Sequence, residues 1–239
     1  QANLYRKAKQ ALSEYLNISP DEVIITSGGD QVIQGVFIIT NPKTLIFEPT
    51  YPMYRLFALH SKKKTKIEIL SPEYEIDTDF FNEYFDLVNI VTPNNPTGNI
   101  QKNSVINSAL KKAGAVLIDE AYHEFSGITY IDLIRKFNNL FITRTFSKAF
   151  SISGLRIGYG ISAKENIRIL ENVMFSPYNV NILSLLICIN IQKLLPHIRK
   201  VNKFIQKEKE KFYSQFDKLK INYLKSCGNF ISFSCDSKL

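Results

Sequence analysis

The chain of 239 residues has no tryptophan and only two methionines, three histidines and three cysteines. Cys188, Cys227 and Cys235 are odd in number and lack the CxxC spacing of a zinc or redox site. We therefore expect no metal centre. Cysteines without a disulfide pattern also favour a reducing compartment, so we predict a cytoplasmic location.

Long apolar runs are also missing. The apolar stretch ILSLLICINI, at 182–191, is too short to span a bilayer. The first residues, QANLYRKAKQ, lack the apolar core of a signal sequence. We expect no membrane partner.

Basic residues exceed acidic ones, with Lys+Arg 30 against Asp+Glu 22 and a formal net charge of +8. The densest basic run, SKKKTK at 61–66, is not followed by a basic stripe with interleaved aromatic residues. We therefore expect no nucleic-acid partner and assign the charge to a solvated surface that attracts anionic metabolites. Hydrophobic residues make up 45% of the chain, which is ample for a sizeable core.

Short apolar, β-branched runs recur along the chain and predict strands. They lie at 23–26, 44–48, 65–70, 87–91, 115–119, 140–144 and 156–161. Helix-like segments lie between them, at 31–39, 51–60, 102–112 and 164–174. Strands that alternate with helices indicate an α/β domain with a largely parallel sheet. Their nearly continuous hydrophobicity indicates strands that are covered on both faces.

The pattern changes after Pro177. Residues 178–195 predict a buried helix, and a polar, amphipathic helix is expected from Pro196 to about residue 218. Two short strands are expected at 221–224 and 230–234. We therefore predict a large domain at 1–195, with an N-terminal helix at 1–16 leading into it. Residues 196–239 are expected to begin a smaller α+β domain.

Polar segments that contain Gly, Pro or charged residues follow five of the predicted strands. In chain order they are TSGGD, EPTY, TPNNPTG, DEAY and TRTFSK. Because the carboxyl ends of parallel strands meet at one edge of a sheet, these segments predict a site there. The last one places Lys148 after Ser147, with Arg156 eight positions on. By itself such a lysine is more typical of a solvated helix end.

Taken together, six motifs resemble the fold-type I pyridoxal-phosphate enzymes, and most closely the histidinol-phosphate aminotransferase branch of the class I/II aminotransferases. The motifs are SGGD (27–30), EPTY (48–51), NNPTG (94–98), DEAY (119–122), TFSKAF (145–150) and GLRIGY (154–159). The resemblance runs from about residue 3 to the end of the chain. It implies a three-layer α/β fold, pyridoxal 5'-phosphate as cofactor and a homodimer.

The resemblance also implies the catalytic residues. Lys148 resembles the lysine that holds the cofactor aldehyde as a Schiff base and then moves a proton. Asp119 resembles the carboxylate that keeps the pyridine nitrogen protonated, so that the ring accepts electrons. Tyr122 and Asn95 resemble the pair that hydrogen-bonds the phenolic oxygen. Glu120 is expected to be structural.

The remaining site residues follow from the same resemblance. Tyr51 resembles the aromatic residue that stacks on the ring. The phosphate is expected at a helix N-terminus and beside hydroxyl and guanidinium groups, an arrangement suited to an anion. The residues assigned to it are Gly28, Gly29, Asp30, Thr145, Ser147 and Arg156. Asn229 matches a family asparagine that contacts the substrate carboxylate.

The chain also departs from the family pattern. Gln31 stands where many members have Glu, in a position that we expect to be outside direct cofactor contact. The tyrosine arm that reaches the partner subunit would precede Gln1, and the arginine that binds the substrate carboxylate or phosphate would follow Leu239. We therefore expect these residues to be part of a longer chain.

The resemblance leaves the substrate open. The first interpretation is transamination between L-histidinol phosphate and 2-oxoglutarate, giving imidazole-acetol phosphate and glutamate in histidine biosynthesis. Threonine-phosphate decarboxylase and aromatic amino-acid aminotransferase share the cofactor motifs. A remote alternative is a non-catalytic pyridoxal-phosphate-binding module.

Overall fold

The computed structural model describes residues 1–173 and 179–234. Residue 174, at the predicted end of one helix, residue 178, at the predicted start of another, and Cys235 lie outside the described residues. So does the end of the predicted small domain, 235–239.

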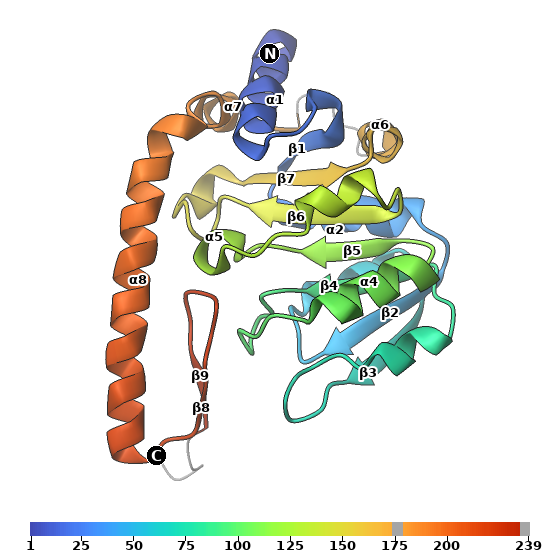
Figure 1. Cartoon of the computed structure of the whole chain (residues 1–239). Helices are drawn as coiled ribbons and strands as arrows, with labels where there is room; N and C mark the ends of the chain where they lie inside the picture. The colour runs from blue at the N-terminus through green and yellow to red at the C-terminus, as the bar shows by residue number, and fades with distance from the viewer. Residues whose placement is uncertain (174–178, 235–239) are drawn as a thin grey trace.

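Seven strands form one sheet at the centre of the molecule, in the order β1-β7-β6-β5-β4-β2-β3 (Figure 1). They are β1 (Val23–Ser27), β2 (Lys43–Glu48), β3 (Lys64–Ile69), β4 (Leu87–Val91), β5 (Val116–Asp119), β6 (Leu140–Thr145) and β7 (Ile157–Ser162). Neighbouring strands from β3 to β6 pair in parallel. Only β7 runs the other way, antiparallel to both β1 and β6.

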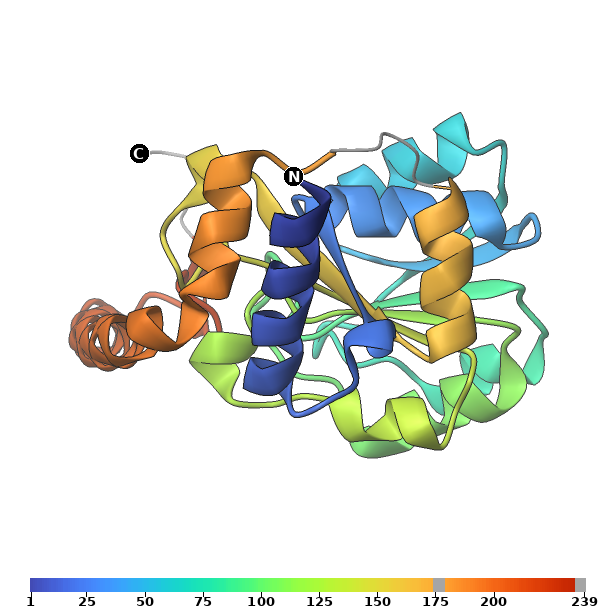
Figure 2. The same ribbon diagram turned by 90° about the horizontal axis from the view of Figure 1, so that it is seen from above.

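Helices cover both faces of this sheet, so the molecule has three layers (Figure 2). They are α1 (Ala2–Leu16), α2 (Gly29–Ile39), α3 (Met53–His60), α4 (Asn103–Lys112), α5 (His123–Ser126), α6 (Lys164–Val173), α7 (Ile182–Ile189) and α8 (Ile191–Leu219). Short 3₁₀ helices connect them at Pro20–Glu22, Thr78–Asn82, Ile131–Arg135 and Ser153–Leu155. The predicted three-layer α/β fold with a mostly parallel sheet is confirmed.

Each face of the sheet has its own hydrophobic core, because alternate residues of a strand point to opposite faces. Along β5, Val116 and Ile118 pack in the core under α1 and α4. The residue between them, Leu117, packs in the core under α2, α3 and α6. All three side chains have no exposed surface. Polar groups are costly along strands buried in this way, so the strand ends are the favourable places for the polar side chains of a site.

The apolar segment near residue 185 differs from the prediction. It forms a short helix, α7, that ends at Asn190, and it is only half buried. Leu185 and Cys188 have no exposed surface, whereas Ile182 and Leu183 are 50% and 62% exposed. The expectation of a buried helix was wrong because α1 lies along only one side of α7 (Figure 2).

The next helix, α8, begins at Ile191 and runs unbroken to Leu219, with Pro196 inside it. Pro196 was expected to start this helix. A proline inside a helix removes one backbone hydrogen bond, and α8 continues through it. The predicted domain boundary between residues 195 and 196 therefore falls within a continuous helix, and the division into two domains stays a prediction.

After α8 the chain returns as a hairpin of β8 (Tyr223–Leu224) and β9 (Ser232–Phe233). The hairpin lies between α8 and the end of the sheet where β4, β5 and β6 terminate (Figure 1). Within 1–173 and 179–234, no single helix is long and apolar enough to cross a membrane. The pair α7 and α8, bent by 80°, meets that length and composition test only when the two are taken together.

Gly158, in β7, marks the tightest contact between the sheet and the start of α2. A Cβ atom added there would lie 2.1 Å from the carbonyl carbon of Gly28 and 2.3 Å from the nitrogen of Gly29. We predict that Gly158→Ala lowers the free energy of unfolding by about 3 kcal/mol, because backbone must move to admit the methyl group. Chemical denaturation measures this change.

Gly154→Ala is the matched control, since a Cβ atom at Gly154 would meet no atom within 4 Å. It should change the free energy of unfolding by less than about 1 kcal/mol. Equal stability of the two variants would contradict the close approach of β7 to Gly28.

Candidate active site

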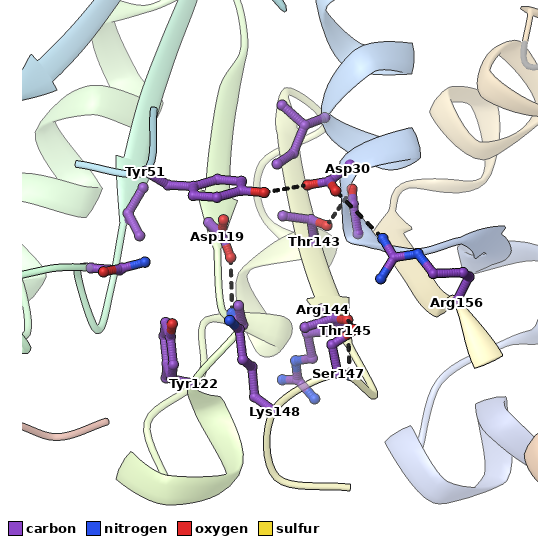
Figure 3. A pocket seen from close by; sticks show the side chains of 15 residues that line it. Asp30, Tyr51, Asp119, Tyr122, Thr143, Arg144, Thr145, Ser147, Lys148 and Arg156 are labelled. Atoms are coloured by element: carbon purple, nitrogen blue, oxygen red, sulfur yellow. Dashed lines mark hydrogen bonds and ion pairs between the residues drawn. The ribbon is translucent and has the colours of Figure 1, made fainter. Parts of the chain in front are cut away.

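A cavity of about 140 Å³ opens at the carboxyl end of the sheet (Figure 3). The residues that line it come from segments far apart in the sequence. They are Gly29, Asp30, Ile33, Tyr51, Val91, Asn95, Asp119, Ala121, Tyr122, Thr143, Arg144, Thr145, Ser147, Lys148 and Arg156. The five polar segments predicted to meet at one sheet edge each contribute to this cavity.

Asp119, the last residue of β5, is a buried carboxylate in the wall of the cavity. Its side chain is 5% exposed. The Tyr54 hydroxyl donates to one carboxylate oxygen at 2.8 Å, and the backbone N–H of Ala121 donates to the other at 2.9 Å. Burial raises the pKa of Asp119 from its ordinary value of 3.8 to about 6, although both hydrogen bonds favour the ionised form and act in the opposite direction.

Lys148 and Tyr122 face each other in the same cavity. Lys148 lies on the turn that follows β6, and its Nζ is 5.3 Å from the centroid of the Tyr122 ring. Tyr122 directly precedes α5, and burial together with the nearby Asp119 charge raises its pKa to about 12. Phe230, from the C-terminal hairpin, packs edge-on against the Tyr122 ring with centroids 5.1 Å apart.

The opposite end of the cavity is built to receive an anion. Helix α2 begins at Gly29, after Gly28, whose φ of 84° suits glycine. The free N–H groups of a helix N-terminus attract anions. Arg156, at the start of β7, directs its guanidinium to this point and lies 3.5 Å from the Asp30 carboxylate (Figure 3). A Cβ atom on Gly28 would lie 2.6 Å from the Arg156 Nη2, so only glycine leaves this space open.

Hydroxyl groups complete this end. The Thr145 hydroxyl donates to the Ser147 Oγ at 3.0 Å and accepts from the Ser147 backbone N–H at 3.1 Å. Tyr51 reaches across from the start of α3, and its hydroxyl donates to Asp30 at 3.2 Å. Figure 3 shows the Tyr51 ring beside Asp119, with the hydroxyl turned toward Asp30.

Two predicted site residues do not line the cavity. Gly28 lies just behind it, against the Arg156 guanidinium. Asn229 is exposed in the turn between β8 and β9. Its neighbour Phe230 makes the hairpin's contact with the site. The structure thus brings the other predicted site residues together, while the role of each stays a prediction.

Several residues of the site were not predicted. Tyr54, which binds Asp119, reads in the sequence as an ordinary core tyrosine, three positions after Tyr51. Thr143 donates its hydroxyl to the carbonyl of Gly29 at 3.3 Å, linking β6 to α2. Tyr54 belongs to none of the motifs, and Thr143 lies in the segment TRTFSK but was assigned no role, so only the fold reveals their contacts.

Arg144 was also not predicted. It forms a buried ion pair with Glu120 at 2.7 Å, in which both side chains are 3% exposed or less. Glu120 also accepts from the backbone N–H of Tyr130 at 2.7 Å. This arrangement agrees with the expectation that Glu120 is structural, because its carboxylate is fully engaged beside the site.

Comparison with known proteins identifies the family. The model of the family described as aminotransferase class I and II matches residues 2–238. The chain belongs to this family.

Within this family, the chain is similar to several histidinol-phosphate aminotransferases. This aminotransferase is 35% identical to the histidinol-phosphate aminotransferase of Thermoanaerobacter pseudethanolicus, over 97% of this chain and 70% of the relative. The solved histidinol-phosphate aminotransferase of Clostridium acetobutylicum is 26% identical, with a TM-score of 0.88 over 98% of this chain and 73% of that one. A histidinol-phosphate aminotransferase from Sinorhizobium meliloti, solved in complex with pyridoxal-5'-phosphate, is 19% identical. Its TM-score is 0.87, over 98% of this chain and 67% of that one.

The residues of the cavity fit pyridoxal phosphate, which is the cofactor of this aminotransferase. An amine and a carboxylate, Lys148 and Asp119, share the inner part of the cavity. A helix N-terminus, two hydroxyls and a guanidinium surround its other end, and the glycines there keep the space clear of side chains. This combination suits pyridoxal phosphate, because the amine can react with its aldehyde, the carboxylate can pair with its ring nitrogen, and the other end of the cavity can bind its phosphate. Among residues 1–173 and 179–234, no group of three or more His, Cys, Asp or Glu side chains is placed to hold a metal ion.

The raised pKa of Asp119 gives a pH-dependent prediction for the apoprotein. In the unfolded chain this carboxyl ionises near 3.8, but in the folded chain near 6. The folded state therefore keeps a proton that the unfolded state has lost. Stability falls as the pH rises from about 4 to about 6, and the full cost, on the order of 3 kcal/mol, is present above pH 6.

We therefore predict that the substitution Asp119→Asn has a more stabilising effect on the apoprotein at pH 7 than at pH 4. The difference in unfolding free energy between the variant and the original chain should grow by about 3 kcal/mol between these two pH values. Denaturant titrations at both pH values measure it. Tyr54→Phe removes a hydrogen bond that favours the ionised carboxylate, so it should destabilise the apoprotein more at pH 7 than at pH 4. A pH-independent effect of both substitutions would contradict the prediction.

Proposed function

We propose that this aminotransferase transfers the amino group of L-histidinol phosphate to 2-oxoglutarate, producing imidazole-acetol phosphate and glutamate in histidine biosynthesis. The observation that carries the proposal is the cavity itself. It joins Lys148, Asp119 and an anion-binding helix end, in a chain 35% identical to a curated histidinol-phosphate aminotransferase.

When bound, pyridoxal phosphate supplies an aldehyde that condenses with amines and a ring that accepts an electron pair from the substrate carbon. We assign Lys148 as the residue that binds the cofactor covalently and carries the proton between the reacting carbons. Asp119 holds a proton on the ring nitrogen. The half-buried position of Lys148, facing Tyr122, keeps its amine in the cavity rather than in bulk water.

The other residues orient the cofactor. Tyr122 and Asn95 donate hydrogen bonds to its phenolic oxygen, and Tyr51 packs on its ring. Thr145, Ser147 and Arg156 bind the phosphate together with Gly28, Gly29 and Asp30. For Asp30 we assign this role to the backbone N–H of the first turn of α2, since its carboxylate already accepts from Tyr51 and lies beside Arg156.

We also propose that the protein is a homodimer. The exposed apolar side chains of Ile182, Leu183 and Leu186 on α7 support this proposal, since clustered exposed apolar residues are typical of interfaces.

The phosphate assignment predicts a selective effect of Arg156. Replacing it, as in Arg156→Met, should weaken binding of pyridoxal phosphate by at least about tenfold, because the guanidinium makes charge-assisted bonds to phosphate. Binding of pyridoxal, which lacks the phosphate, should change by less than about threefold. Arg135→Met, at an exposed arginine outside the cavity, is the matched control. Equal losses for both ligands would contradict the assignment. Absorption titrations of the apoprotein measure both affinities.

The function is tested on the holoenzyme. Borohydride reduction followed by peptide mapping should place the pyridoxyl group on Lys148, and Lys148→Ala should abolish turnover. Of histidinol phosphate, threonine phosphate and phenylalanine, the first should be the best amino donor in a reaction that requires 2-oxoglutarate. Carbon dioxide release from threonine phosphate would instead indicate a decarboxylase, and preference for phenylalanine would indicate an aromatic aminotransferase.

A label on another lysine would contradict the site, and absence of amino-group exchange with any donor would favour a non-catalytic binding module. Light scattering on the same sample gives its mass, and a monomeric holoenzyme would contradict the homodimer.

A further inference from the structure

A buried lysine on α8, outside the cavity, binds the turn that precedes β9. Lys209 is 5% exposed, and its Nζ donates to the carbonyl of Ser226 at 2.6 Å and to the carbonyl of Gly228 at 2.9 Å. Lysine is rarely buried to this degree, since an ammonium group loses its water. Two neutral carbonyls two residues apart replace that water here. The burial is therefore tied to one particular conformation of the turn.

A second group on α8 holds the same turn. The Tyr213 hydroxyl accepts from the backbone N–H of Ser226 at 3.0 Å. Within the turn, the N–H of Gly228 donates to the Ser226 hydroxyl oxygen at 3.0 Å. Residues 226–228 are thus fixed from one side by two side chains that lie four positions, or about one helical turn, apart on α8.

The other side of the turn is bound to the loop that carries Asn95. The backbone N–H of Cys227 donates to the carbonyl of Gly98 at 2.8 Å, and the Ser232 hydroxyl donates to the carbonyl of Pro96. A Cβ atom on Gly98 would lie 2.3 Å from the Ser226 hydroxyl oxygen, which shows how closely the two segments approach.

The turn also reaches the cavity directly. It continues through Asn229 to Phe230, whose ring packs against Tyr122. A chain of contacts therefore runs from Lys209 through residues 226–230 to Tyr122, which lines the cavity, and to Gly98, in the loop that carries Asn95.

We propose that Lys209 is a positioning residue for the active site. By binding the carbonyls of Ser226 and Gly228, it fixes the turn that sets Asn229 and Phe230 beside the Asn95 loop and Tyr122. The kinetic part of this inference rests on the proposed function, because it requires Asn229 to contact the carboxylate of 2-oxoglutarate. The structural part does not depend on which amine is the substrate.

The experiment compares three variants of the holoenzyme. Lys209→Met removes the ammonium but keeps a long side chain. Lys209→Arg keeps a cation that can donate to both carbonyls. Lys207→Met is the matched control, since Lys207 is exposed on the same helix. For each variant we record hydrogen exchange by mass spectrometry, and steady-state kinetics in which 2-oxoglutarate is varied at a saturating concentration of the best amino donor.

For Lys209→Met we expect faster exchange in peptides that span 94–99 and 225–231, and unchanged exchange in the β5 peptide 115–119. The KM for 2-oxoglutarate should rise by about tenfold, with kcat changed by less than about threefold, because charge-assisted bonds that order the turn are lost. Lys209→Arg should recover most of both effects, and Lys207→Met should match the original protein.

Two results would overturn the proposal. Uniformly faster exchange, including the β5 peptide, would show that Lys209 only stabilises the fold. An unchanged KM with faster local exchange would show that the turn does not act on substrate binding. If Lys209→Met does not fold, Tyr213→Phe tests the same turn more mildly, and it must accelerate exchange in the same two segments for the proposal to stand. Absence of turnover in the original protein would refute the proposed function alone, since the exchange pattern is read without substrate.

Discussion

The carboxylate of Asp119 lies at the end of a strand whose other side chains are buried on both faces of the sheet. A carboxylate in such a place is costly, and the raised pKa expresses that cost. Two hydrogen bonds, from Tyr54 and Ala121, and the nearby Lys148 ammonium partly offset it. The cavity that contains this carboxylate also holds charged side chains of Asp30, Arg144, Lys148 and Arg156. This cost agrees with the role proposed for Asp119, because a buried carboxylate with few partners gains from pairing with a protonated ring nitrogen.

The rest of the site follows from the same sheet. The polar segments that follow β1, β2, β4, β5 and β6 all lie at one edge of the sheet, and the loops there meet in one cavity. The reversed strand β7 brings its first residues to that edge as well. Arg156 therefore faces the N-terminus of α2, although it precedes its strand rather than following one. Close packing of Gly158 against Gly28 keeps these two segments together.

The C-terminal part of the chain packs against the main core through Ile198 and Phe230, and polar contacts fix its returning turn at this edge. Lys209 and Tyr213 hold one side of a turn, and the Asn95 loop holds the other. A network of buried hydrogen bonds holds one geometry rigidly when every polar group has its partner, but loss of one partner leaves another group unpaired. This arrangement agrees with the positioning role proposed for Lys209.

Much of the fold and the cavity could be predicted from the sequence. The apolar runs locate the strands to within a residue or two, and the polar segments after them identify which loops meet. Lys148, Asp119 and the glycines before α2 stand in recognisable motifs, because the chemistry proposed for them requires particular residue types. Their local order in the chain, from SGGD to GLRIGY, is a property of the sequence alone.

Other features were decided only by tertiary structure. β7 is antiparallel to its neighbours β1 and β6. An apolar run predicts a strand but does not indicate whether that strand pairs in parallel or antiparallel. Tyr54 and Thr143 look like ordinary core residues until the fold places them against Asp119 and Gly29. The prediction of a buried helix near residue 185 failed because periodicity reveals an apolar surface but not whether another element covers it. Lys209 reads as one of many lysines on a polar helix, and only the returning hairpin buries it. In each case the deciding contact joins residues distant in sequence, which no local pattern records.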